Sequence, residues 1–140
     1  MLSPTSPLYL DHPYAEPSAN ADDEARRAQV GLAFYPPKQV YGLDPGGTLA
    51  TTPDREATAT GTEATVWRQT TTSVKDLEFL LLPRLTGIAE RAWSPAASGE
   101  RDGYRGRLAA QSVAWRHHNW TWFASTPVDW LSHPSGDEEA

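Results

Sequence analysis

Two short pairs of residues each combine an aromatic ring with a polar group that can bind hydroxyls. They are Tyr9 with Asp11 and Trp67 with Gln69, and a single residue separates the members of each pair. Each pair stands at the end of a stretch whose composition is typical of a short β-strand. An aromatic face suits the apolar C–H face of a sugar ring, while a carboxylate or an amide can hold its hydroxyl groups. The four residues together indicate a candidate sugar pocket.

The same residue types also have a purely structural interpretation. Tyr9 and Trp67 are compatible with an ordinary aromatic core, and Asp11 and Gln69 with capping of loops. His12, next to the first pair, is predicted to be a loop residue. Ligands of parallel α/β folds bind at the carboxyl ends of the strands. The pocket interpretation therefore requires that two neighbouring strands bring both pairs to one edge.

The elements around the two pairs follow the order of two consecutive βα units. A strand end at residues 8–10 precedes a helix at 19–30, and a second strand at 58–67 precedes a helix at 73–93. This order predicts an α/β class with parallel strands and helices on their faces. Two strands are too few to form a parallel sheet buried on both sides. The pattern therefore indicates a piece of a larger fold.

The helix predicted over residues 73–93 has the strongest pattern in the chain. Ser73 and Asp76 resemble a capping box, and apolar residues then recur at spacings of three and four, which is typical of one helix face. These are Leu77, Leu80, Leu81, Leu85, Ile88 and Ala92. Pro83 lies in the middle and predicts a kink, because proline has no N–H for the carbonyl one turn earlier.

The acidic run at the start of the first helix has a structural explanation. Asp22, Asp23 and Glu24 precede Arg26 and Arg27, which is the order of charges that the helix dipole favours. The run is therefore predicted to form the first turn of the helix at residues 19–30, not a pair of catalytic carboxylates.

The C-terminal part of the chain is predicted to close the structure. A helix over residues 101–118 carries apolar residues on one side, and the sequence then continues through a Trp-rich segment to an acidic tail at 131–140. Exposed clusters of tryptophan are unfavourable in water, so packing is favoured over an exposed platform for sugars. The tryptophans concerned are Trp115, Trp120, Trp122 and Trp130. The predicted organisation is thus a partial α/β fold at 1–95, a closing segment at 96–130 and the tail.

Composition excludes several classes of function. The 140 residues carry 12 Lys and Arg against 18 Asp and Glu, a net charge of −6, which argues against nucleic acid as a partner. There is no cysteine, and no histidine has a second ligand at metal-binding spacing, so we expect neither a metal nor another cofactor. No apolar stretch approaches the roughly 20 residues that span a bilayer, and no signal peptide is visible. We therefore expect no membrane partner, and the localisation stays undetermined.

Two longer segments carry a more specific pattern, residues 61–69 (GTEATVWRQ) and residues 76–94 (DLEFLLLPRLTGIAERAWS). They resemble the last βα unit of glycoside hydrolase family 20, the β-N-acetylhexosaminidases. Residues 3–11 are similar to its penultimate strand with the Y-x-D motif, and residues 41–45 to its Y-x-x-D-P loop. The family fold is a (β/α)₈ barrel, which needs roughly 200 residues or more. The resemblance implies that this chain is the C-terminal fragment of such a barrel, strands 7 and 8 with their helices, plus a C-terminal helical segment.

The resemblance also implies a role for each candidate residue. Tyr9 would donate its hydroxyl to the carbonyl oxygen of the substrate's 2-acetamido group, and Asp11 would accept from sugar hydroxyls near C4 and C6. Trp67 would form a wall of the pocket against which the sugar ring packs. Gln69 stands where the family usually has a Glu that accepts from the C4 hydroxyl. Phe34 stands where many relatives have a pocket tryptophan.

The resemblance implies hydrolysis of terminal N-acetylhexosamine residues by substrate-assisted catalysis, an exception to the usual two-carboxylate scheme. In the family an Asp-Glu pair at the end of strand 4 performs it: the Glu protonates the glycosidic oxygen and the Asp orients the attacking acetamido group. The Asp-Glu neighbours of this chain are Asp23-Glu24 and Asp137-Glu138, and neither follows a strand. The strand-1 Arg that clamps the sugar hydroxyls is also missing. We therefore expect no catalytic residue in this chain.

Two hypotheses about function follow, from different classes. The first is a partial β-N-acetylhexosaminidase, inactive by itself, arising from a truncated gene product, a split reading frame or an excised segment. Its expected partners are an N-acetylhexosamine-containing glycan and an upstream polypeptide that supplies strands 1–6. The second is a non-catalytic sugar-binding or interaction module, or a degenerate remnant, that retains the aromatic residues of the pocket.

Overall fold

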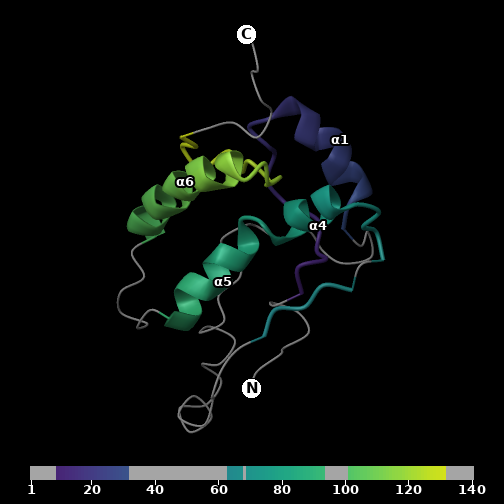
Figure 1. The fold of residues 1–140 in the computed structure, drawn as a ribbon, viewed down its shortest axis with the longest axis horizontal. Helices are drawn as coiled ribbons and strands as arrows, with labels where there is room; N and C mark the ends of the chain where they lie inside the picture. The colour runs from purple at the N-terminus through teal and green to yellow at the C-terminus, as the bar shows by residue number, and fades with distance from the viewer. Residues whose placement is uncertain (1–8, 32–62, 68, 94–100, 132–140) are drawn as a thin grey trace, which may run out of the picture.

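The structure is a computed structural model that describes residues 9–31, 63–67, 69–93 and 101–131. These ranges contain four helices, joined by turns and extended segments. The helices are α1 (Ala21–Gln29), α4 (Val74–Leu81), α5 (Arg84–Trp93) and α6 (Arg101–His117). Figure 1 shows α1 and α4 on one side of the molecule and α5 and α6 on the other. No helix in these ranges is long and apolar enough to cross a membrane.

The predicted first helix is confirmed as α1. Asn20 caps it, because its side-chain oxygen accepts from the backbone N–H of Asp22 at 3.1 Å. The helix ends before Gly31, whose φ of +104° lies in the region that glycine tolerates best. The predicted helix at the C-terminal side is likewise confirmed as α6.

The long helix predicted over residues 73–93 is two helices, so the expected kink is a complete break. Its start is confirmed: Ser73 Oγ accepts from the N–H of Asp76 at 3.2 Å, and Asp76 Oδ2 accepts from the N–H of Ser73 at 3.0 Å. Leu82 is extended, with φ −103° and ψ 128°. The ring of Pro83 disfavours the helical conformation of the residue before it, which is why α4 stops at Leu81.

The two extended segments that end in the aromatic and polar pairs run side by side. Tyr9 and Thr65 form a parallel β-bridge, and the N–H of Leu10 donates to the carbonyl of Thr65 at 2.9 Å. This confirms the expected parallel arrangement of the two segments. A second bridge, antiparallel between Ser18 and Ser125, joins the start of the chain to its C-terminal segment and was not predicted from the sequence.

The larger of two hydrophobic clusters lies where α1, α4, α6 and the C-terminal segment meet. At its centre the ring of Tyr14 stacks on Phe123, with 3.8 Å between centroids, and meets Phe79 edge-on at 5.6 Å. Trp115 and Trp122 are buried in the same cluster. The predicted packing of the Trp-rich segment is therefore confirmed for these residues.

Trp130 also packs against this cluster, whereas Trp120 is 45% exposed. Trp120 stacks on His118, with 5.3 Å between ring centroids, so the packing prediction is wrong for this one tryptophan. The segment after α6 turns back toward the core at this point, which leaves the ring on the surface.

A smaller cluster joins the candidate pocket to α5. Leu10 and Ile88 are its buried members, and Ala64, Val66 and Leu81 pack against them. Because this cluster contains residues of both extended segments, it fixes their position relative to the helices. The polar and aromatic residues at the ends of the segments therefore lie next to a small apolar cluster.

Candidate functional site

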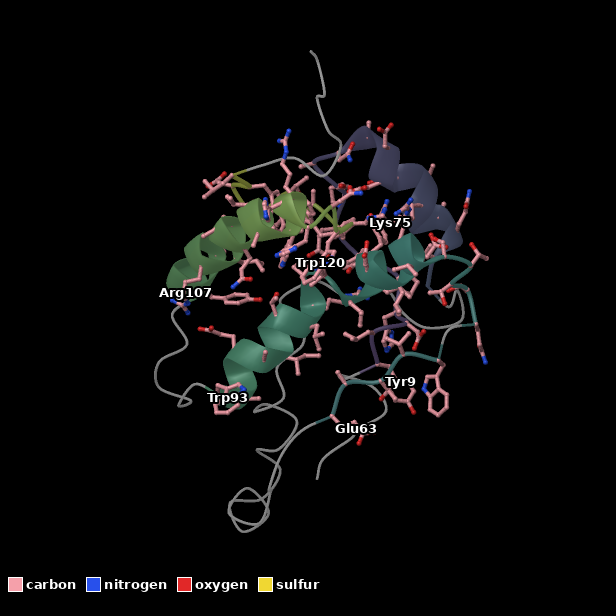
Figure 2. All side chains as sticks on the ribbon, viewed as in Figure 1. Tyr9, Glu63, Lys75, Trp93, Arg107 and Trp120 are labelled. Carbon is pink, nitrogen blue, oxygen red and sulfur yellow. The ribbon has the colours of Figure 1, made fainter. Side chains whose placement is uncertain are left out.

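Three of the predicted pocket residues lie together at one edge of the parallel segments. The rings of Tyr9 and Trp67 meet edge-on, with centroids 6.1 Å apart and an interplanar angle of 64°. The N–H of Trp67 donates to Asp11 Oδ2 at 2.8 Å. Figure 2 shows Tyr9 near Glu63 on the lower part of the molecule, at the opposite side from α1. The expectation that both pairs reach one edge is thus met for these three residues.

The two aromatic residues are not members of the buried core. Trp67 is 56% exposed, and the side chain of Tyr9 is half-buried. Together they present an aromatic surface to solvent. Within the described residues, the two rings are therefore surface aromatics and not members of a core.

Asp11 is fully buried, and its two carboxylate oxygens differ in their hydrogen bonding. Oδ2 accepts the bond from Trp67, which is the loop-capping role that the residue type also indicated. Oδ1 is buried and has no hydrogen-bond partner among the described residues. Buried carboxylate oxygens without a partner are unfavourable, and native proteins contain few of them. This oxygen is a candidate acceptor for a ligand hydroxyl that displaces the atoms now covering it.

Among the remaining candidates that the structure describes, Gln69 is not part of this cluster. Gln69 is exposed, and its side chain makes no hydrogen bond to Tyr9, Asp11 or Trp67. Phe34 lies outside the residues that the structure describes. His12 lies in the turn after Asp11, as predicted for a loop residue, but its side chain is buried.

Arg84 is the polar residue near the site that sequence reasoning missed. It is fully buried, and its guanidinium donates to the carbonyl of Leu10 at 3.1 Å, to that of Pro13 at 2.9 Å and to that of His12. Burial lowers the pKa of Arg84, and the nearby Tyr14 and acidic groups oppose this effect. One sequence signal was present: Arg84 stands four residues from both Leu80 and Ile88, in register with the buried face.

The adjacent acidic residues of α1 are occupied by structural contacts. Asp23 Oδ2 accepts from Ser18 Oγ at 2.7 Å and from the N–H of Ala124 at 3.4 Å, and burial raises the pKa of this carboxyl. Glu24 accepts from the N–H of Ser18 at 2.9 Å and pairs with Arg27 at 2.8 Å. The prediction that this run is a helix turn and not a catalytic pair is consistent with these contacts. Asp137 and Glu138 lie outside the described residues.

Within residues 9–31, 63–67, 69–93 and 101–131, no cluster of three or more His, Asp or Glu side chains could hold a metal ion.

Comparison with known proteins identifies relatives of the chain. The family described as glycosyl hydrolase family 20, catalytic domain, matches residues 1–96. A β-N-acetylhexosaminidase from Cellulomonas fimi is 29% identical over 130 residues, which are 93% of this chain and 24% of that protein. A β-hexosaminidase from Vibrio vulnificus is 24% identical over 152 residues, covering 89% of this chain and 17% of that protein.

Solved structures of the same family have a similar fold. The β-N-acetylhexosaminidase of Streptomyces coelicolor A3(2) superposes with a TM-score of 0.73 and 31% identity, over 94% of this chain and 25% of that one. The Streptomyces plicatus enzyme, solved in complex with Thio-NAglucal, superposes with a TM-score of 0.72 and 33% identity over 93% and 24%. The chain thus spans about a quarter or less of the relatives it matches. Since the family match covers more than half of its residues, the chain belongs to glycosyl hydrolase family 20.

Proposed function

We propose that this chain forms one side of the sugar pocket of a β-N-acetylhexosaminidase, as strands 7 and 8 of its barrel. The observation that carries the proposal is the cluster of Tyr9, Asp11 and Trp67, in which two solvent-facing rings adjoin a carboxylate with one unpartnered oxygen. Rings next to a hydrogen-bond acceptor form the combination that holds a sugar by its C–H face and its hydroxyls.

Each residue of the cluster has a defined part in this proposal. Trp67 is the wall against which an N-acetylhexosamine ring packs. Asp11 Oδ1 accepts from a hydroxyl on the C4 or C6 side of that ring. Tyr9 donates its hydroxyl to the carbonyl oxygen of the acetamido group, which holds that group beside C1. The substrate is a glycan with a terminal N-acetylhexosamine.

We propose that the proton for the reaction is supplied from outside this chain. General acid catalysis needs a donor within hydrogen-bond reach of the leaving oxygen. The carboxylates of Asp23 and Glu24 are engaged with Ser18 and other residues of their own helix region, so this pair is not available. The acid and its neighbouring aspartate are proposed to come from an upstream polypeptide that carries strands 1–6.

The test combines the chain with the strands that the proposal assigns to an upstream polypeptide. The chain is joined to the first six βα units of the Streptomyces coelicolor relative, and this joined enzyme is compared with the 140-residue chain on a chromogenic N-acetyl-β-glucosaminide. We expect turnover by the joined enzyme and none by the chain alone. Turnover by the chain alone would show that it contains its own acid. A folded joined enzyme that neither binds N-acetylglucosamine nor hydrolyses the substrate would contradict the proposed pocket.

Gln69→Glu is expected to increase kcat/KM of the joined enzyme by roughly tenfold. A hydrogen bond to a charged group is worth about 1.5–3 kcal/mol against about 1 for a neutral one, and 1.36 kcal/mol corresponds to a factor of ten in rate. The measurement is steady-state kinetics on one N-acetylhexosaminide. Gln111→Glu, on the exposed side of α6, is the matched control for the added charge. Equal rates for both variants and the parent would mean that Gln69 does not face the sugar.

A further inference from the structure

The side chain of Arg84, at the start of α5, contacts the turn that carries Asp11. The guanidinium of Arg84 donates through Nη1 to the carbonyls of Leu10 and His12, and through Nη2 to that of Pro13, 2.9 Å away. Leu10 and His12 are the neighbours of Asp11 on either side. The backbone of Asp11 is therefore fixed both before and after the residue.

Arg84 is itself held in one place. Its side chain is fully buried, and its guanidinium lies over the ring of Tyr14, 3.8 Å from the ring centroid. The hydroxyl of Tyr14 donates to the carbonyl of Phe79 at 2.7 Å, and this ring stacks on Phe123. The donor that fixes the turn is therefore anchored in the larger hydrophobic cluster.

The contact continues from the turn to the other side of the candidate pocket. Asp11 uses Oδ2 to accept from the N–H of Trp67, so the position of the carboxylate also fixes the backbone of Trp67. The other oxygen, Oδ1, is left without a partner in the described part of the chain. Displacement of the turn would thus move the unpartnered oxygen and the aromatic wall together.

We infer that Arg84 is a positioning residue of the sugar pocket: it acts through the turn at residues 10–13 to set Asp11 and, through Asp11, Trp67. The geometry depends on the guanidinium in particular. Its planar fork reaches several carbonyls in fixed directions, whereas the ammonium of lysine is a single point with the same charge. The consequence for catalysis rests on the proposed function, but the effect on the position of Trp67 does not.

The first experiment measures how strongly the backbone amide of Trp67 is protected in the 140-residue chain without any sugar. Backbone hydrogen exchange is compared in the parent, Arg84→Lys and Arg84→Gln. We expect the exchange of the Trp67 amide to accelerate at least tenfold in both variants. The amide of Phe123, which donates to the carbonyl of Leu82 at 3.0 Å, should change less than threefold. Arg107→Lys, which alters an exposed ion pair between Arg107 of α6 and Glu90 of α5, is the matched control and should leave both amides unchanged.

The second experiment separates a positioning role from a general structural one. In the joined enzyme, Arg84→Lys should raise KM about tenfold while kcat changes less than threefold, because a displaced Asp11 weakens sugar binding in the ground state and the transition state alike. Arg107→Lys should match the parent in both constants.

Several outcomes would overturn the inference. An unchanged Trp67 amide in both variants would do so, whatever the activity. Equal acceleration of the Trp67 and Phe123 amides, or loss of the helical circular dichroism signal in both Arg84 variants, would show that Arg84 supports the fold as a whole. If the parent joined enzyme is inactive, the proposed function fails, and the exchange measurements alone decide whether Arg84 positions Trp67.

Discussion

Trp67→Ala in the joined enzyme is expected to lower kcat/KM by about 100-fold. The substitution removes the more exposed of the two rings that meet at 6.1 Å, and with it the wall on which the sugar packs. A 100-fold loss corresponds to about 2.7 kcal/mol at 1.36 kcal/mol per factor of ten. This lies within the roughly 1.5–3 kcal/mol that burial of a large apolar side chain contributes. Steady-state kinetics on a single N-acetylhexosaminide measures the effect.

Trp120→Ala is the control for this substitution. Trp120 is also a partly exposed tryptophan, but it stacks on His118 after α6 and not on Tyr9. We expect its replacement to leave kcat/KM within a factor of two of the parent. Comparable losses for the two variants, or no loss for Trp67→Ala, would contradict the assignment of Trp67 to the pocket.

Phe123→Ala is expected to lower the free energy of unfolding of the 140-residue chain by about 3–5 kcal/mol, the usual range for a buried phenylalanine. Phe123 is fully buried, stacks on Tyr14 and meets Phe79 edge-on at 5.6 Å. Its removal leaves a cavity between α4 and the C-terminal segment, and the stacked ring of Tyr14 loses its partner. Urea unfolding followed by tryptophan fluorescence measures the change.

Val113→Ala provides the comparison for the stability measurement. Val113 is 54% exposed on α6, so its truncation should cost no more than about 0.5 kcal/mol. A loss below about 1 kcal/mol for Phe123→Ala would mean that the C-terminal segment adds little to the stability of the chain. The same result would weaken the anchoring of Tyr14, and therefore of Arg84.

Local sequence patterns were sufficient where the interactions are local. The capping box of Ser73 and Asp76 joins residues three apart, and both of its hydrogen bonds are present. The charge order of α1 is likewise set within one helix. The position of the interruption at Pro83 was predicted correctly, but a kink was expected and the helix ends there. The extended conformation of Leu82 terminates α4.

The pairs at residues 9–11 and 67–69 could be recognised as candidates from their types alone, because aromatic and polar side chains at strand ends are an unusual combination. Their convergence required the parallel pairing of Tyr9 with Thr65, residues more than fifty positions apart. Sequence reasoning treated the second pair as a unit, yet the structure joins Trp67 to the cluster and leaves Gln69 exposed. Two positions of spacing in the sequence therefore did not decide whether both members of the pair reach the cluster.

Tertiary structure alone decided how the site is held. The bond from Trp67 to Asp11 spans 56 positions, and the bonds from Arg84 to the turn span 71 to 74. A periodic pattern reports which face of a helix is buried, but it cannot report which carbonyls a buried guanidinium will meet. Those carbonyls belong to a turn whose path depends on the packing of Tyr14 between Arg84 and Phe123. Residue types therefore indicated the chemistry of the pocket, while long-range packing determined the position of each group that would perform it.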